Sequence, residues 1–470
     1  MKAITEKMIR NGQGIPLNER IFTTRTLNLN TVKVMGFDMD YTLVLYREAV
    51  LEDLIFHLTV ENLVEKLGYP GEIRDLKFNT DRVIRGLVID RKLGNLLKIN
   101  LFGYIKAALH GNHFYTRDEL REIYGDEIVT FQSGRYEMIH TMYSLALSDL
   151  FCQITSLEIG SLSYERLYED LMETINSLHR HGPVKESILK EPDKYILIDK
   201  KYVDTLLMLK SFGKRLILIT NSDWTYTKSI MPFCYDTFLT GGKTWRDLFD
   251  LVIVDAVKPD FFTAQNPYYE VVSENGHLLK TLREIRRDRV YQGGNANAIE
   301  RLFGVPSGQI LYVGDHIYSD VYHSKKISHW RTMLVISELE MELSAAAEAD
   351  QSLREIKEQM TVKEELELEL DNVKKREIAE GAESRHLTGE EERIRGAIQG
   401  IDGKVGGLIE TLNARFNPNW GELLFAGNDK SYFFMAIQRY ACTYTSRVSN
   451  LLHYSPVHYF RPPIKSYELT

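Results

Sequence analysis

The stretch TVKVMGFDMDYT, Thr31–Thr42, decides the fold. Its first part, Thr31–Phe37, is short, apolar and rich in β-branched residues, which predicts a buried strand that ends at Asp38. Helical periodicity, as in Tyr202–Phe212, lies between this strand and similar later ones. The later strands are expected at Arg215–Thr220, Leu251–Val254 and Ile310–Val313. Apolar strands that alternate with helices predict an α/β fold, with a parallel sheet covered by helices on both faces.

The chain is too long for this sheet alone. About 180 residues separate the first strand from the second, which is too many for one crossover connection. The intervening span has patterns of its own, and we expect an inserted cap domain over the ligand-binding edge of the sheet. Its expected elements are a helix near Leu51–Leu67, strands near Arg85–Asp90 and Asn95–Asn100, and a helix around Tyr136–Phe151. The predicted domains are a core (1–48 and 195–338), a cap (49–194), a charged helical arm (339–415) and a C-terminal segment that packs on the core (416–470).

The arm is dense in Glu, Lys and Arg, and its apolar residues fall mostly three or four positions apart. These apolar residues are Leu353, Ile356, Met360, Leu366, Leu370 and Val373. The spacing predicts one or two long amphipathic helices. Such an arm either packs one stripe on the body of the protein or binds a partner, a second copy included, and the sequence leaves both open.

Composition narrows the class of protein. Of 470 residues, 44% are hydrophobic and 11% aromatic, enough for sizeable cores. The net charge of −8 gives no support to a nucleic-acid surface, and no apolar run approaches the roughly 20 residues of a membrane span. The three cysteines are widely separated and form no paired Cys-x-x-Cys zinc motif and no disulfide framework. The start MKAITEKMIRNGQG lacks the apolar block of a signal peptide. We expect a cytoplasmic protein without nucleic-acid or membrane partners.

Polar residues follow each of the four predicted strands. Asp38 and Asp40 come two apart after the first strand, and such close carboxylates repel unless a cation lies between them or one is protonated. Thr220 and Asn221 end the second strand, and Lys258 follows the third. After the fourth come Gly314, Asp315 and Asp320. Taken singly, these are also typical of turn or capping aspartates, an ordinary helix start and a solvated lysine. Together they place carboxylates, donors and one ammonium group at the edge where parallel sheets bind ligands.

This ordered set, D-x-D-x-T, T-N, K and G-D-x-x-x-x-D, resembles the haloacid dehalogenase (HAD) superfamily of phosphotransferases. Longer stretches are similar to the cytosolic purine 5′-nucleotidase family. They are RGLVIDRKLGNLLKI (Arg85–Ile99), HGNHF (His110–Phe114), LITNSDWTYT (Leu218–Thr227), GDHIYSDVYHSKK (Gly314–Lys326), WRTMLVISEL (Trp330–Leu339) and RYACTYTSRVSNLLHYSPVHYF (Arg439–Phe460). The similarity covers most of the chain and implies a HAD-like Rossmannoid sheet, with the cap inserted between the first two motifs.

The resemblance implies roles for the acidic residues. Asp38 would be the nucleophile that forms an aspartyl-phosphate, and Asp40 the general acid and base. Mg²⁺ would be held by Asp38, the main-chain carbonyl of Asp40 and Asp315. Asp320 would be either a further metal ligand or the partner that orients Lys258, and the sequence does not separate these roles. Hard oxygen ligands favour Mg²⁺ over zinc.

The resemblance also implies binding residues. The phosphate would be bound by Thr220 and Lys258, supported by Asn221. Base and ribose contacts would come from Asn112, His113, His179 and Lys185. Relatives have charged residues where this chain has Met172 and Asn176, so the family's preference for IMP and GMP is less firmly implied than its chemistry. Lys325 and Lys326 stand where a nucleotide effector would bind, with Lys326 the candidate contact, although adjacent lysines are also typical of a solvated helix face. Family members assemble as homo-oligomers, so a dimer or tetramer is expected.

Three functions follow. The first is a Mg²⁺-dependent 5′-nucleotidase that hydrolyses purine nucleoside monophosphates. The second is a nucleoside phosphotransferase, which uses the same intermediate with a nucleoside in place of water. The third is a nucleotide-sensing scaffold without catalysis, against which the presence of a nucleophile argues.

Overall fold

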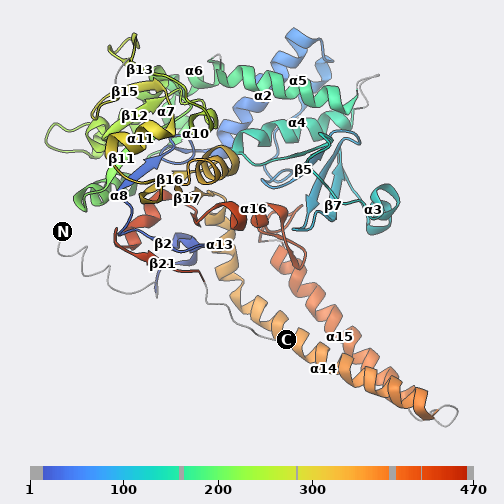
Figure 1. Cartoon of the computed structure of the whole chain (residues 1–470). Helices are drawn as coiled ribbons and strands as arrows, with labels where there is room; N and C mark the ends of the chain where they lie inside the picture. Colours follow the sequence, from blue (N-terminus) through green and yellow to red (C-terminus); the bar gives the residue numbers. More distant parts are fainter. Residues whose placement is uncertain are drawn as a thin grey trace. The chain divides into compact units, whose positions relative to one another are not determined.

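The computed structural model describes residues 14–157, 163–180, 182–281, 284–380, 388–413 and 415–462. They form two compact units, Met1–Glu340 with Leu423–Thr470, and Met341–Glu422. The first unit holds both the central sheet and the inserted segment (Figure 1). None of the helices in the described ranges is long and apolar enough to cross a bilayer.

A ten-stranded sheet is the centre of the first unit. In spatial order its strands are β1 (Phe22–Thr23), β20 (Thr443–Thr445), β17 (Arg331–Val335), β16 (Ile310–Gly314), β3 (Val34–Phe37), β11 (Arg215–Ile219), β12 (Leu251–Val254), β15 (Val290–Gly293), β13 (Tyr268–Val271) and β14 (Leu278–Lys280). From β20 to β15 all neighbours are parallel, and the outer strands are antiparallel. The four strands predicted from the sequence are adjacent here, which confirms the α/β fold with a parallel sheet.

The strands are apolar throughout because both faces of the sheet are buried. One set of alternating residues, such as Ile217 and Tyr312, packs in a cluster with α10 (Asp260–Thr263) and α11 (Ala296–Phe303). Strand β11 also contacts α8 (Lys200–Ser211). Further helices of this region are α9 (Trp224–Tyr235) and α12 (His323–Lys326), whereas α13 (Leu339–Glu348) belongs mostly to the second unit. Two-sided burial explains why no polar alternation marks these strands.

The inserted segment has its own five-stranded antiparallel sheet and a group of helices. The strand order is β8 (His113–Phe114), β7 (Ile105–His110), β6 (Asn95–Ile99), β5 (Val88–Asp90) and β9 (Tyr136–Met138). The helices are α2 (Glu48–Leu67), α3 (Arg117–Tyr124), α4 (Leu145–Thr155), α5 (Tyr164–Arg180), α6 (Pro183–Lys190) and α7 (Pro192–Tyr195), of which α2, α4 and α5 pack together (Figure 1). Strands β4 (Leu45–Tyr46) and β10 (Ile196–Leu197) pair where the chain leaves and re-enters the core.

The helix expected around Tyr136–Phe151 was wrong in its first half. Tyr136 and Met138 are buried while Glu137 is exposed, which is strand periodicity, and this segment pairs with β5 as β9. A turn at Met142–Ser144, capped by Thr141, then leads into α4. The first strand and α2 also differ slightly in their bounds from the prediction, beginning at Val34 and Glu48.

The C-terminal segment returns to the core. It contains α16 (Tyr432–Tyr440), then β20, which joins the central sheet beside β17, a 3-10 turn at Val448–His453, and β21 (Tyr459–Phe460) paired with β2 (Leu27–Asn28). A small hairpin of β18 (Phe425–Ala426) and β19 (Asp429–Lys430) precedes α16.

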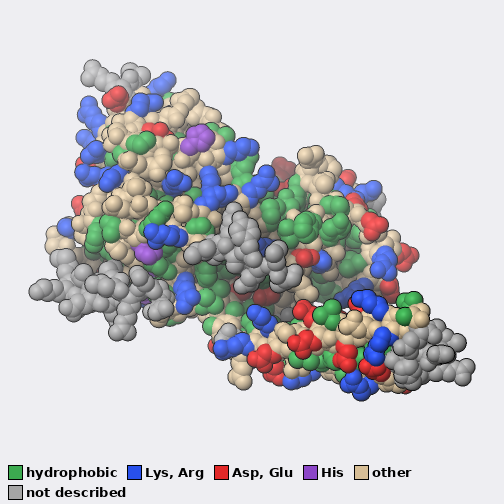
Figure 2. All heavy atoms as spheres, turned by 60° about the horizontal axis from the view of Figure 1, so that its bottom comes forward, with side chains coloured by type: hydrophobic (Ala, Val, Ile, Leu, Met, Phe, Trp, Pro, Cys, Tyr) green, Lys and Arg blue, Asp and Glu red, His purple; other side chains and the backbone are tan. Residues whose placement is uncertain are grey.

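The second unit is dominated by α14 (Asp350–Glu380) and α15 (Thr388–Asn413), which pack against each other. Ion pairs such as Lys363–Asp402 (2.6 Å) and Arg376–Glu390 (3.0 Å) run in antiparallel register. Val373 and Ile394 are fully buried between the helices. Acidic and basic side chains are interspersed on the face of this hairpin that Figure 2 shows.

Candidate active site

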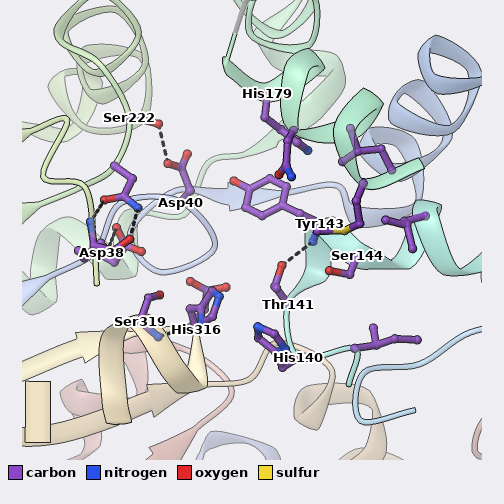
Figure 3. A pocket seen from close by; sticks show the side chains of 18 of the residues that line it. Asp38, Asp40, His140, Thr141, Tyr143, Ser144, His179, Ser222, His316 and Ser319 are labelled. Atoms are coloured by element: carbon purple, nitrogen blue, oxygen red, sulfur yellow. Dashed lines mark hydrogen bonds and ion pairs between the residues drawn. The ribbon is translucent and has the colours of Figure 1, made fainter. Parts of the chain in front are cut away.

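The carboxyl ends of β3, β11, β12 and β16 meet at one cavity of about 720 Å³. Parallel strands in register bring together residues that are far apart in sequence. Asp38 follows β3, Asn221 follows β11, Lys258 follows β12 and Asp315 follows β16, and all four line the cavity. Figure 3 shows this cavity with Asp38 and Asp40 on one side and Tyr143 and His179 of the inserted segment opposite.

Lys258 is the electrostatic centre of the site. Its Nζ lies 2.8 Å from Asp38 Oδ1, 2.8 Å from Asp320 Oδ1 and 3.0 Å from the hydroxyl of Tyr312. Burial alone would lower the pKa of Lys258, but Asp320 and Asp38 outweigh it, and the pKa lies well above its usual value. Lys258 is therefore a buried, charged ammonium group shared between two carboxylates.

A glycine lets Asp320 approach the strand end. A Cβ atom at Gly314 would lie 2.4 Å from Asp320 Oδ2, closer than any side chain tolerates. Asp320 lies in a π-helical turn, Ile317–Tyr322, and its Oδ2 accepts a hydrogen bond from the His316 main-chain N–H at 3.1 Å. Any larger residue at position 314 would push this carboxylate away from Lys258.

Three buried carboxylates are suited to hold a metal ion. Asp38, Asp315 and Asp320 each offer an oxygen within 4.8 Å of the others. Burial and the neighbouring Asp320 raise the pKa of Asp315 to about 8, and burial likewise raises that of Asp38 despite Lys258. One ammonium group does not balance three carboxylates, so a hard divalent cation with oxygen ligands fits this cluster.

Asp40 lies beside this cluster and is held by two hydroxyls. Tyr46 donates to its Oδ1 at 2.5 Å and Ser222 to its Oδ2 at 2.8 Å. The Tyr46 hydroxyl is also 2.8 Å from that of Tyr226. These contacts fix the carboxylate of Asp40 at the cavity wall.

The two residues that follow β11, Thr220 and Asn221, make different contacts. Asn221 binds the main chain of Lys258, since its Oδ1 accepts from the Lys258 N–H at 2.6 Å and its Nδ2 donates to the Lys258 carbonyl at 3.1 Å. Thr220 is fully buried, and its hydroxyl accepts from the Ser222 N–H at 2.9 Å. Ser222, which the sequence did not single out, lines the cavity, whereas Thr220 does not.

The wall formed by the inserted segment is largely aromatic and apolar. The ring of Tyr143 meets that of His179 edge-on, with centroids 4.6 Å apart. Burial, and then Lys185, lowers the pKa of His179 to about 4, so this ring is neutral. Lys185 also lines the cavity and is paired with Asp223 at 2.7 Å. The remaining residues of this wall include Leu147, Tyr168, Met172, Ile175 and Asn176.

Asn112 and His113 do not line this cavity, and their role as substrate contacts stays a prediction. They lie at the turn into β8, one edge of the five-stranded sheet, whereas the cavity is bordered by β5 and β9 at the other edge. Asn112 accepts a hydrogen bond from Arg82 at 2.5 Å, and the exposed His113 lies 3.0 Å from Glu119. A sequence match preserves a segment but does not reveal which edge of a sheet the segment occupies.

The two lysines of the predicted effector contact lie outside this cavity as well. Lys326 is exposed, and its Nζ donates to the hydroxyl of Tyr322 at 2.7 Å. Lys325 is half-buried, with its Nζ 3.1 Å from the sulfur of Cys442.

Comparison with known proteins shows the family of this chain. The profile of a protein family described as the 5′ nucleotidase family matches residues 21–468, nearly the whole chain. The chain belongs to the 5′-nucleotidase family. A 5′-nucleotidase domain-containing protein of Dictyostelium discoideum is 29% identical over 453 residues, which cover 92% of this chain and 72% of that protein. The resemblance found in the sequence is thus confirmed, and this 5′-nucleotidase family member is a phosphoric monoester hydrolase.

Two solved structures overlap more loosely with this 5′-nucleotidase family member. A predicted phosphoglycolate phosphatase from Haemophilus somnus is 13% identical, with a TM-score of 0.27, over 65% of this chain and 85% of that chain. A 2-haloacid dehalogenase from Pseudomonas syringae is 14% identical, with a TM-score of 0.23, over 65% and 87%. These scores are low, and the fold assignment rests on the sheet order and on the strand ends described above.

Proposed function

We propose that this protein is a Mg²⁺-dependent 5′-nucleotidase that hydrolyses purine nucleoside 5′-monophosphates, with IMP and GMP preferred, through an aspartyl-phosphate. The observation that carries the proposal is the placement of Asp38. Its Oδ1 accepts from the Met39 N–H at 2.7 Å and from Lys258 at 2.8 Å. Its Oδ2 has no protein partner among the described residues and is available to attack phosphorus.

In the first step, Asp38 Oδ2 forms a bond to phosphorus while the bond to the 5′ oxygen breaks. Asp40 donates a proton to the leaving oxygen. In the second step, Asp40 takes a proton from the water that attacks the aspartyl-phosphate, and Asp38 is released. Lys258 neutralises charge on the phosphoryl oxygens and is held in place by Asn221. When bound, Mg²⁺ would be held by Asp38 and Asp315 and would offset the repulsion between carboxylate and phosphate.

Tyr46 and Ser222 give Asp40 its orientation in both steps. Each donates to one oxygen of the carboxylate, so the side chain cannot turn away from the cavity without breaking a hydrogen bond. A general acid must lie within hydrogen-bond reach of the atom it protonates, and a fixed carboxylate meets this requirement.

The inserted segment would hold the nucleoside. The aromatic face of Tyr143 and the neutral ring of His179 suit a planar base. Preference for a 6-oxopurine comes from the family resemblance. Met172 and Asn176 lie in the same wall and offer no charge to the base.

The test is phosphate release from IMP, GMP, AMP, CMP, UMP and a sugar phosphate, with Mg²⁺ and with EDTA, by the wild type and an Asp38→Asn variant. Activity on IMP and GMP that is lost with EDTA and in the variant supports the proposal. Activity centred on another monophosphate would keep the chemistry and overturn the assigned substrate. With GMP as the phosphate donor, inosine added as acceptor separates hydrolysis from phosphotransfer, because transfer forms IMP and guanosine without releasing phosphate. No turnover on any substrate, with ATP or GTP added as effectors, would favour the nucleotide-sensing scaffold.

A further inference from the structure

Two histidines on the cavity wall are locked in opposite tautomers. His140 Nδ1 lies 2.7 Å from the main-chain carbonyl of Met138, which only accepts, so Nδ1 carries the proton and Nε2 is bare. Burial lowers the pKa of His140, which keeps the ring neutral at neutral pH. His140 therefore presents a hydrogen-bond acceptor.

His316 is fixed the other way. Its Nδ1 accepts from the main-chain N–H groups of Tyr318 at 3.2 Å and Ser319 at 3.1 Å, as the cap of the π-helical turn. A nitrogen that accepts two N–H groups carries no proton, so the proton of His316 is on Nε2. His316 therefore presents a hydrogen-bond donor.

The two rings are in contact and both line the cavity. Their centroids are 4.8 Å apart, and the planes meet at 67°. Neither Nε2 has a hydrogen-bond partner within the described parts of the chain. In the view of Figure 3, His316 is drawn between Asp38 and His140. His316 directly follows Asp315 in the chain, and His140 belongs to the segment that carries Tyr143. The contact between the two rings therefore joins these two segments.

We propose that His140 and His316 bind the ribose of the substrate through its 2′ and 3′ hydroxyls. The inference rests on the proposed nucleotidase function and deepens it. A hydroxyl both donates and accepts, so neighbouring hydroxyls satisfy a bare nitrogen and an N–H together. A phosphate group does not fit, because its oxygens would face the lone pair of His140. The base does not fit either, because the ribose separates it from the phosphate, and His316 directly follows the phosphate-end residue Asp315.

The experiment compares ribonucleotides with their deoxy forms: IMP with 2′-deoxy-IMP and 3′-deoxy-IMP, and GMP with its 2′- and 3′-deoxy counterparts. The steady-state parameters kcat and KM are measured for the wild type, for His140→Phe and for His57→Phe. Phenylalanine keeps an aromatic ring against His316 and removes the acceptor. His57 is an exposed histidine on α2, so its variant is the matched control.

We expect the wild type to prefer the ribonucleotide over at least one deoxy form by about three- to tenfold in kcat/KM, mainly through a lower KM. This is the factor that corresponds to the loss of one neutral hydrogen bond. His140→Phe should bring the ratio for at least one of the deoxy forms close to one, while His57→Phe leaves both ratios unchanged.

Two other results would overturn the inference alone. The first is a wild type that hydrolyses ribo and both deoxy forms equally, a comparison that needs no variant to fold. The second is a His140→Phe variant in which the preferences over both deoxy forms are as large as in the wild type. Absence of activity on every nucleotide would instead overturn the proposed function, and this inference with it.

Discussion

Replacing Asn221 by alanine tests whether this residue acts on the substrate or on Lys258. Its amide makes two hydrogen bonds to the main chain of Lys258, at 2.6 and 3.1 Å. At about 1 kcal/mol for each neutral bond, their loss is worth about 2 kcal/mol. If all of this energy serves to place Lys258 against Asp38 and the phosphate, kcat/KM should fall about thirtyfold, since about 1.4 kcal/mol corresponds to a factor of ten.

The assay is a double-mutant cycle on phosphate release from IMP. It compares the wild type, Asn221→Ala, Lys258→Met and the double variant, with single-turnover measurements where steady-state rates are too slow. If Asn221 acts through Lys258, then Asn221→Ala should cost threefold or less once Lys258 is methionine, a strongly non-additive result. A full thirtyfold loss in the Lys258→Met background would refute this reasoning and show that Asn221 contacts the substrate itself.

Three further predictions follow from particular contacts. Tyr46→Phe removes the hydrogen bond to Asp40. Because this bond is made to a charged group, kcat should fall about tenfold, while KM changes by no more than about twofold. An unchanged kcat would contradict this. Adding Mg²⁺ to EDTA-treated protein should raise the Tm by neutralising the carboxylate cluster. Asp315→Asn should abolish this rise in Tm, whereas Asp320→Asn should only reduce it. Equal effects of the two substitutions would contradict the different roles of Asp315 and Asp320. Burial raises the pKa of Glu52 to about 8 from 4.5, so folding favours its protonated form and its contribution to stability is lost as pH rises between these values. In urea denaturation, the free energy of unfolding of the wild type should fall relative to that of Glu52→Gln by about 1.4 kcal/mol per pH unit from pH 5.5 to 7.5. If the free energies of the two proteins change with pH in parallel, the raised pKa of Glu52 is excluded.

The sequence predicted the phosphate end of the site because its residues are tied to strand ends. Asp38, Lys258 and Asp315 each come within a few residues of a short apolar strand, and neighbouring parallel strands bring such positions together. For these residues, the position relative to a strand in the sequence therefore also gives the position in space. The roles of these residues stay predictions, whereas their convergence on one cavity is a property of the structure.

Three other residues around the site had no such signal. Tyr46 lies on β4, Ser222 follows β11 and His140 follows β9, and neither residue type nor spacing distinguishes them from ordinary polar or aromatic residues. Tyr46 reaches Asp40 because β4 pairs with β10 where the chain leaves and re-enters the core. That pairing joins residues about 150 positions apart, a long-range contact that local periodicity does not encode.

The two roles that the sequence left open for Asp320 can now be weighed. Both oxygens of Asp320 have protein partners, since Oδ1 pairs with Lys258 and Oδ2 accepts from the His316 N–H. Asp38, by contrast, keeps one oxygen without a protein partner in the described part of the chain. A carboxylate with both oxygens engaged contributes charge to a nearby cation but would have to give up a hydrogen bond or an ion pair to coordinate it directly. Because Gly314 leaves room for this arrangement and no larger residue would, the geometry favours Asp320 as the residue that orients Lys258.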